Sequence, residues 1–502
     1  MSFETKNIFL PEITSDTVYR KDLEFDGSLP EDSPDVTRLI RVDARPSKPS
    51  VTAENGKLCV KSDVVFGILY ESDFRSKPAY AQVKASFSQM TDISAPAGEY
   101  FPFANVRCAF LTCKLLGARR FVIRASMETA VSVITVCERT VTDARPDENT
   151  FFRTAEAEYR LPCRVFTEQR TFEGSAVAPK PVSGVIFTDG YCLSPETQAE
   201  EGLLNFKVPV TLKAFCEGED GGFFAVPYSF EASLVCADPD IDPAQEFSSD
   251  AHMVSCFAES EADEYGETRV IRFRCEICVN AVSYEKTVET VADDAFCSDR
   301  ITETSCTRAD YHERAGELKH GFEFEKGYDT ERTDIRGIID MTVSFSVDSV
   351  EYGEGVLRIK GAYSAEYLAE TDSGIIGGGF GDGYETSAAL PKDEKAINVK
   401  VEPGDINCSV ADGETVTLRG SAKISAELYS ARSLTVLDSV AATGAAPESE
   451  SGLTFYYPES SETSWDIAKR YRKDPAGIKN GNPDSFDPEG KLKPGVLFVT
   501  VK

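Results

Sequence analysis

The side chains that could do chemistry are few and widely spaced. The chain has three histidines, His252, His312 and His320, and each lies in a segment that reads as a loop. A hydrolase triad or a zinc site needs partners at a defined spacing, such as G-x-S-x-G or H-E-x-x-H. Neither spacing accompanies these histidines. The sequence therefore predicts no catalytic residues, and we expect the protein not to be an enzyme.

Three further patterns resemble sites for ions or phosphate. Cys275-x-x-Cys278 lies within a strand pattern, where residues three apart point to opposite faces of a sheet and do not chelate one ion. The segment DPDIDP at 238–243 alternates acids as a calcium loop does, but it lacks the sixth-position glycine and has Ser249 at position twelve. GIIGGGFGDGY at 374–384 is followed by no Lys-Ser/Thr pair, which predicts a loop and not a phosphate cradle. We expect no metal and no cofactor.

Composition limits the class of partner. The 502 residues include 84 acidic and 53 basic side chains, for a net charge of −31. Nucleic acid and anionic membranes both select a positive surface, so neither is expected as a partner. The N-terminus MSFETKNIFLPE lacks the basic start and apolar core of a signal peptide, and no apolar stretch reaches the roughly 18 residues of a transmembrane segment. We expect a cytoplasmic protein whose fourteen scattered cysteines are reduced and mostly buried.

One turn-and-strand pattern occurs three times along the chain. It reads NGKLCVKSDVVFGILYESD, then EGLLNFKVPVTLKAFCEGED, then EGVLRIKGAYSAEYLAETDSG. Gly56, Gly202 and Gly355 mark the three starts, separated by 202 − 56 = 146 and 355 − 202 = 153 residues. Recurrence at a nearly constant spacing is the signature of internal repeats.

A second landmark follows in the same order. Three strand segments, FVIRASMETAVSVI, IRFRCEICVNAVSY and VTLRGSAKISAELY, align at Arg124, Arg274 and Arg419. These arginines are separated by 274 − 124 = 150 and 419 − 274 = 145 residues. These arginines are expected to cover apolar surface or to pair with acids across the sheet. Two landmarks in one order predict three copies of one domain.

The strands alternate apolar and polar residues, as when Leu357 and Ile359 alternate with Arg358 and Lys360. This period is typical of antiparallel sheets with one buried face. We predict a mainly β protein of three tandem antiparallel β-sandwich or barrel-like repeats followed by a small βααβ domain. The predicted boundaries are an acidic lead-in at 1–31, repeats at 32–145, 155–300 and 318–442, a flexible linker at 443–451, and the tail at 452–502.

The tail carries its own local signals. Leu453, Phe455 and Tyr457 alternate as a half-buried strand would. Thr463 followed by Asp466 predicts an N-cap for a helix led by Trp465, and Asp474 before a proline predicts the cap of a second helix.

With turns at Asn482-Pro483 and Pro494-Gly495, this tail resembles a LysM module. The resemblance implies recognition of N-acetylglucosamine polymers or docking onto a protein. A groove would then be lined by Ser460, Ser461, Thr463, Ile478, Asn480 and Asn482. The basic cluster of Lys469, Arg470 and Lys473 would steer the tail onto an acidic protein surface, although the same cluster also fits an ordinary solvated helix face.

The order of the parts, together with SPDVTRLIRVDARPS leading into GKLCVKSDVVFGILYESD, resembles the SPOCS-domain sporulation proteins of endospore-forming Firmicutes. That resemblance implies a non-enzymatic scaffold of spore coat assembly, made in the mother cell and placed at the forespore surface. Its tail would dock on a spore coat or basement-layer protein. The alternative is a peptidoglycan-binding protein that acts through the LysM-like tail.

Overall fold

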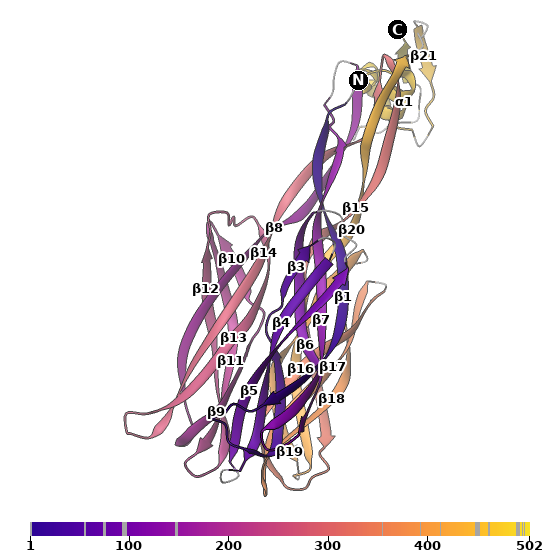
Figure 1. Ribbon diagram of the computed structural model, residues 1–502. Helices are drawn as coiled ribbons and strands as arrows, with labels where there is room; N and C mark the ends of the chain where they lie inside the picture. Colours follow the sequence, from indigo (N-terminus) through magenta and orange to yellow (C-terminus); the bar gives the residue numbers. More distant parts are fainter. Residues whose placement is uncertain are drawn as a thin grey trace.

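The computed structural model describes residues 3–54, 57–73, 77–92, 98–145, 149–353, 355–391, 393–411, 413–446, 452–459, 462–487, 492–493, 495 and 497–501. The chain is mainly β-structure in antiparallel sheets, and the α-helices within the described residues lie at the C-terminal end (Figure 1). None of the helices in those ranges is long and apolar enough to cross a membrane.

The first segment of the fold contains two facing sheets. One sheet has the order β1-β7-β6, formed by Thr5–Ser28, Arg120–Thr142 and Gly98–Leu115. In the other, β4 (Lys57–Ser72) pairs with β5 (Pro78–Asp92) on one side and with β2 (Val36–Pro46) and β3 (Ser50–Glu54) on the other. Phe66 of β4 and Phe121 of β7 belong to one buried cluster, so the two sheets pack face to face.

The second and third segments have the same strand order. In the second, β13-β14-β8 (Glu246–Ala262, Thr268–Cys297, Thr150–Val177) faces β11 (Leu203–Gly218), which pairs with β12 (Phe223–Ala237), β9 (Val182–Cys192) and β10 (Glu196–Glu200). In the third, β15-β20-β19 (Arg300–Asp329, Thr415–Ala445, Glu394–Ala411) faces β16-β17-β18 (Ile335–Gly353, Val356–Thr371, Gly374–Ala389). Each segment thus pairs its first strand with its last.

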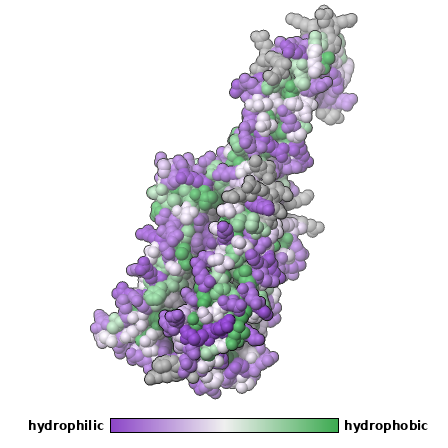
Figure 2. Space-filling model, in the orientation of Figure 1, coloured by the Kyte–Doolittle hydropathy of each residue, from purple (hydrophilic) through white to green (hydrophobic). Residues whose placement is uncertain are grey.

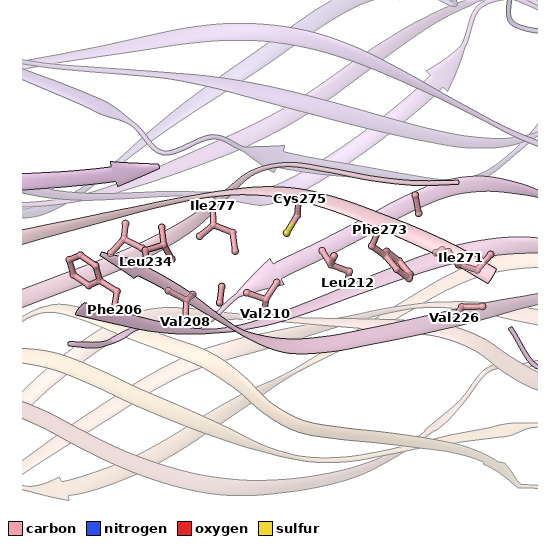
Figure 3. Packing of buried hydrophobic residues seen from close by; sticks show 14 of the residues in the cluster. Phe206, Val208, Val210, Leu212, Val226, Leu234, Ile271, Phe273, Cys275 and Ile277 are labelled. Atoms are coloured by element: carbon pink, nitrogen blue, oxygen red, sulfur yellow. The ribbon is translucent and has the colours of Figure 1, made fainter. Parts of the chain in front are cut away.

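Side chains from facing sheets fill the interior of each segment. In the second segment, the alternating apolar residues of β11 and β14 point toward one another, including Leu212, Phe273 and Ile277 (Figure 3). Gly202 and Gly355, which begin β11 and β17 in sequence, have φ values of +72° and +81°. These are left-handed conformations that glycine adopts without steric cost, which explains why a glycine marks these two starts.

The three segments close into a ring. β5 contacts β9, β12 contacts β16, and β18 contacts β2. The first and last strands of each segment continue beyond this body into a narrow stalk (Figure 1). The stalk has one core to which all three segments contribute corresponding residues, namely Leu10, Tyr159 and Tyr311, then Ile8, Ala157 and Ala309, then Val141, Val291 and Val436.

The tail lies at the far end of the stalk (Figure 1). Its elements are β21 (Gly452–Tyr456), α1 (Ser464–Tyr471), α2 (Pro475–Gly481), the 3₁₀ helix η1 (Pro483–Ser485) and β22 (Leu497–Val501). The two strands pair antiparallel along their length.

Four segment predictions are wrong about local structure. Residues 1–31 are not a separate lead-in, because β1 pairs with β7 from Thr5 to Ser28. Residues 301–317, which the predicted boundaries leave between the second and third repeats, belong to strand β15. The predicted linker at 443–451 begins inside β20, and its later residues lie outside the described ones. The glycine-rich stretch at 374–384 is strand β18 and not a loop.

The three histidines also lie in strands and not in loops. His252 is in β13, and His312 and His320 are in β15. The sequence around His312 and His320 is rich in charged residues, a pattern that surface loops share with solvent-exposed strands. His312 Nδ1 accepts a hydrogen bond from the backbone N–H of Ile13 at 3.2 Å, which joins the third segment to the first.

Candidate functional site

Each of the two tail helices begins directly after a predicted N-cap residue. Thr463 and Asp466 form a reciprocal capping box, in which the Thr463 side chain accepts from the Asp466 backbone N–H and the Asp466 carboxylate accepts from the Thr463 backbone N–H. Asp474 accepts from the backbone N–H groups of Ala476 and Gly477 and so caps α2. These caps confirm the predicted helix starts and satisfy backbone donors that a short helix would otherwise leave open.

One carboxylate of the stalk binds two side chains of the tail. Asp294 of β14 accepts a hydrogen bond from Trp465 Nε1 at 2.9 Å and forms an ion pair with Lys469 at 2.6 Å. The Trp465 ring packs edge-on against Phe296, with 5.0 Å between ring centroids. A register shift in the pairing of β14 with β8 between Ala292 and Asp294 marks a bulge, a feature that re-aims a side chain.

These hydrogen bonds determine the charge state of Asp294. Burial alone would raise its pKa, but the hydrogen bonds from Lys469 and Trp465 outweigh burial and lower the pKa below the ordinary aspartate value. The carboxylate is therefore ionised at neutral pH and holds both tail side chains.

The predicted groove residues are divided between the interior and the surface. Ile478 is in the tail core, and Asn482 is 4% exposed with its Nδ2 donating to the Ile478 carbonyl at 2.9 Å. Thr463 is engaged in the capping box, whereas Asn480 is exposed. Ser460 and Ser461 lie outside the described residues. Of the predicted groove, Asn480 is the described residue whose side chain stands exposed outside a cap.

The predicted basic cluster is also divided. Lys469 is bound to Asp294, and Arg470 pairs with Glu462 at 2.7 Å while its guanidinium lies over the Tyr456 ring. Lys473 forms no ion pair with the part of the chain that the structure describes, and the same is true of the exposed Lys479. Lys473 and Lys479 are therefore available to an outside partner.

In the first tail strand, the alternating apolar residues are exposed and not buried. Leu453, Phe455 and Tyr457 are 56%, 60% and 71% exposed, and Tyr456 instead packs against Tyr471 at the edge of the tail core. Alternation alone fixes which residues share a face, but not which face the rest of the tail covers.

The metal-like patterns have ordinary structural roles. Cys275 is buried in the core of the second segment, and all fourteen cysteines are unpaired. Asp238 and Asp240 in the DPDIDP turn form ion pairs with Arg164. Within the described ranges, no three or more His, Cys, Asp or Glu side chains are grouped so that they would hold a metal ion.

A cavity of about 290 Å³ lies between the three segments, and sequence reasoning did not find it. Strands β6, β13 and β19 contribute corresponding positions to its wall, first Asn105, Asp250 and Lys400, then Arg107, His252 and Glu402. These positions correspond because the residues that they pair with in β7, β14 and β20 have the same sequence spacing as Arg124, Arg274 and Arg419. In the sequence these residues only alternate with apolar ones, as on any strand face exposed to solvent. The sequence therefore does not distinguish a cavity wall from a solvated surface.

Comparison of the chain with protein-family models, with curated proteins and with solved structures finds no match.

Proposed function

We propose that the protein is a non-enzymatic scaffold of spore envelope assembly, built from three copies of one β-sandwich domain and a LysM-like tail that docks on a protein partner. The observation that carries the proposal is the position of the tail, held at the end of the stalk and away from the body (Figure 1). A binding module at the tip of a long spacer reaches a partner that the body does not touch.

The recurring strand order supports the triplication, because each segment pairs its strands in the same sequence. The sequence resemblance supports the assignment to spore envelope assembly. On that basis the protein is made in the mother-cell cytoplasm and acts at the forespore surface, where the tail meets a coat or basement-layer protein.

Charge supports a protein partner over a glycan. The chain carries a net charge of −31, and hydrophilic residues cover much of its visible face (Figure 2). Against this background Lys473 and Lys479 form a local positive surface on the tail, which favours encounter with an acidic protein. Ile478 and Asn482, which a sugar groove would use, are buried in the tail.

The test reverses the charge of Lys473 and Lys479. Full-length protein with Lys473→Glu and Lys479→Glu is compared with wild type for association with purified coat and basement-layer proteins at two salt concentrations. We expect slower association and a flatter salt dependence. The matched control reverses two exposed body lysines, Lys207 and Lys326, and should bind as wild type does.

A second titration separates protein docking from glycan binding. Trp465 is the only tryptophan in the chain, so its fluorescence reports on the tail. Saturable change with N-acetylglucosamine oligomers at sub-millimolar concentration, together with unchanged protein binding by the Lys473/Lys479 variant, would replace the scaffold assignment with peptidoglycan recognition.

A further inference from the structure

The cavity between the segments has a wall built around shared charges. Asp250 lies between two lysines from different segments, with Lys48 Nζ at 2.8 Å and Lys400 Nζ at 3.0 Å. Burial would raise the pKa of Asp250, but the two lysines outweigh it and hold the pKa well below the ordinary value. Two ammonium groups thus share Asp250, and Lys400 also interacts electrostatically with the Glu402 carboxylate.

Another part of the wall repeats the arrangement with arginines. Glu128 is buried and forms ion pairs with both Arg107, which lines the cavity, and Arg20. Arg107 also lies 3.8 Å from the exposed Asp348. Two cations therefore share one buried carboxylate here as well.

Each acid in the wall already has hydrogen-bond or ion-pair partners. The third acid, Glu402, accepts hydrogen bonds from the backbone N–H and the hydroxyl of Ser194, with the hydroxyl at 2.8 Å. Each carboxylate that lines the cavity thus has at least two donors. Lys48 and Lys400 each have three N–H donors and are each bound to one side chain among the described residues. Both lysines therefore keep N–H donors that these contacts do not use.

His252 adds an unsatisfied polar atom. Its Nδ1 is buried and has no hydrogen-bond partner in the part of the chain that the structure describes. Burial, reinforced by Lys48 and opposed by Asp250, lowers the pKa of His252 to about 4, so the ring is neutral at pH 7. A neutral imidazole can donate a hydrogen bond from one ring nitrogen without adding charge.

We propose that this cavity binds a small anion with at least two charged oxygens, such as phosphate or a short dicarboxylate, held by Lys48, Lys400, Arg107 and His252. A buried donor without an acceptor is costly, and an anion supplies acceptors to several donors at once. The volume of about 290 Å³ exceeds the roughly 30 Å³ share of one water several-fold, so it holds such an ion with its remaining waters. Because the wall combines side chains of all three segments, the bound ion would also link them.

Calorimetry on the full-length protein tests the site directly. Inorganic phosphate and malonate are titrated separately to about 10 mM, a range that detects binding of millimolar affinity, with sodium chloride at matched ionic strength as the reference. In parallel, NMR of selectively labelled histidine follows the three imidazoles. We expect saturable heat with at least one dianion and a shift confined to His252, with His312 and His320 unchanged.

Two variants locate the binding. Lys48→Met should weaken binding at least about tenfold, the scale of one lost charge-assisted hydrogen bond. Lys207→Met, an equal change at an exposed lysine of β11, should leave it unchanged. Since Lys48→Met also removes an ion pair of Asp250, His252→Gln provides an uncharged second probe, and circular dichroism checks that each variant is folded. Absence of saturable heat from both anions, or binding that leaves the His252 resonance unmoved, would overturn the proposal.

Discussion

Charged side chains at two levels of the body join all three segments. Lys48, Asp250 and Lys400 come from the first, second and third segments respectively. At the other level, Asp340 of the third segment pairs with Arg41 of the first at 3.4 Å and with Lys213 of the second at 3.1 Å. Buried ion pairs add little net stability, but each requires a specific partner. We infer that these two triads fix which segment occupies which place in the ring.

Asp294 has the corresponding role between stalk and tail, and its removal is the first prediction. Asp294→Asn should loosen the tail, because the amide cannot hold the Lys469 ammonium by charge and competes poorly for the Trp465 N–H. Loss of such a charged hydrogen bond costs about 1.5–3 kcal/mol. The emission of Trp465 should shift to the red as water reaches the ring. Asp293→Asn, next in the chain and paired with Arg153, is the matched control and should leave the emission unchanged.

The same contact predicts a pH dependence. The folded-state pKa of Asp294 is lowered, so its contribution is fully present above the pKa of an unfolded aspartate, about 3.9, and is lost as pH falls through the lowered value. Wild-type Trp465 emission should therefore stay constant from neutral pH to about 4 and shift only below it. A shift already complete near pH 6 would contradict the assignment to this carboxylate.

At the scale of single elements, β18 shows why a glycine-rich stretch can be a strand. A side-chain carbon on Gly377 would overlap the backbone carbonyl oxygen of Ile40 in β2, the neighbouring strand of another segment. Gly378 has the same relation to the Tyr367 ring. Gly377 allows the backbones of two segments to approach closely, which is a known use of glycine within strands, and Gly378 makes room for a ring of its own segment.

This close approach gives an element-scale prediction with two opposite signs. Gly377→Ala should destabilise the protein by about 1–3 kcal/mol, because the ring must open to accommodate the methyl group. Gly337→Ala in β16 is the control, since nothing lies within 4 Å of a carbon added there. It should be neutral or stabilise slightly, by about 0.5 kcal/mol, through the unfolded chain. Chemical denaturation midpoints measure both, and equal effects would show that β18 does not depend on the approach.

The mainly β character was predictable because strands such as β17 alternate apolar and charged residues over one buried face. The long stalk strands were not. In the stalk part of β15, Ala309, Tyr311 and Arg314 are buried, and most of the residues around them are polar or charged. Tyr311 packs against Tyr159 of the second segment, and no local pattern in β15 predicts that contact. The tail caps are local and were predicted, whereas the cavity wall is assembled from three distant strands and was not.

At the scale of the whole molecule, the stalk core makes the segments depend on one another. Tyr159 is fully buried there and packs against Tyr311, with 5.3 Å between ring centroids, although the two residues belong to different segments. A core shared in this way disappears when any one contributor unfolds. We therefore expect the three segments to unfold together and not as independent domains.

Tyr159→Ala tests this dependence. Removing a buried aromatic side chain costs about 3–5 kcal/mol, and the loss should shift one single transition for the whole chain. Far-UV circular dichroism follows all the sheets, while Trp465 fluorescence follows the tail beyond the stalk. The two curves should coincide in the wild type and move together in the variant. Tyr159→Phe is the matched control, because the Tyr159 hydroxyl has no hydrogen-bond partner among the described residues, and it should unfold at the wild-type midpoint or slightly above. A dichroism curve that splits, with only part of the strand signal displaced, would mean that the segments are stable separately and that the stalk merely connects them.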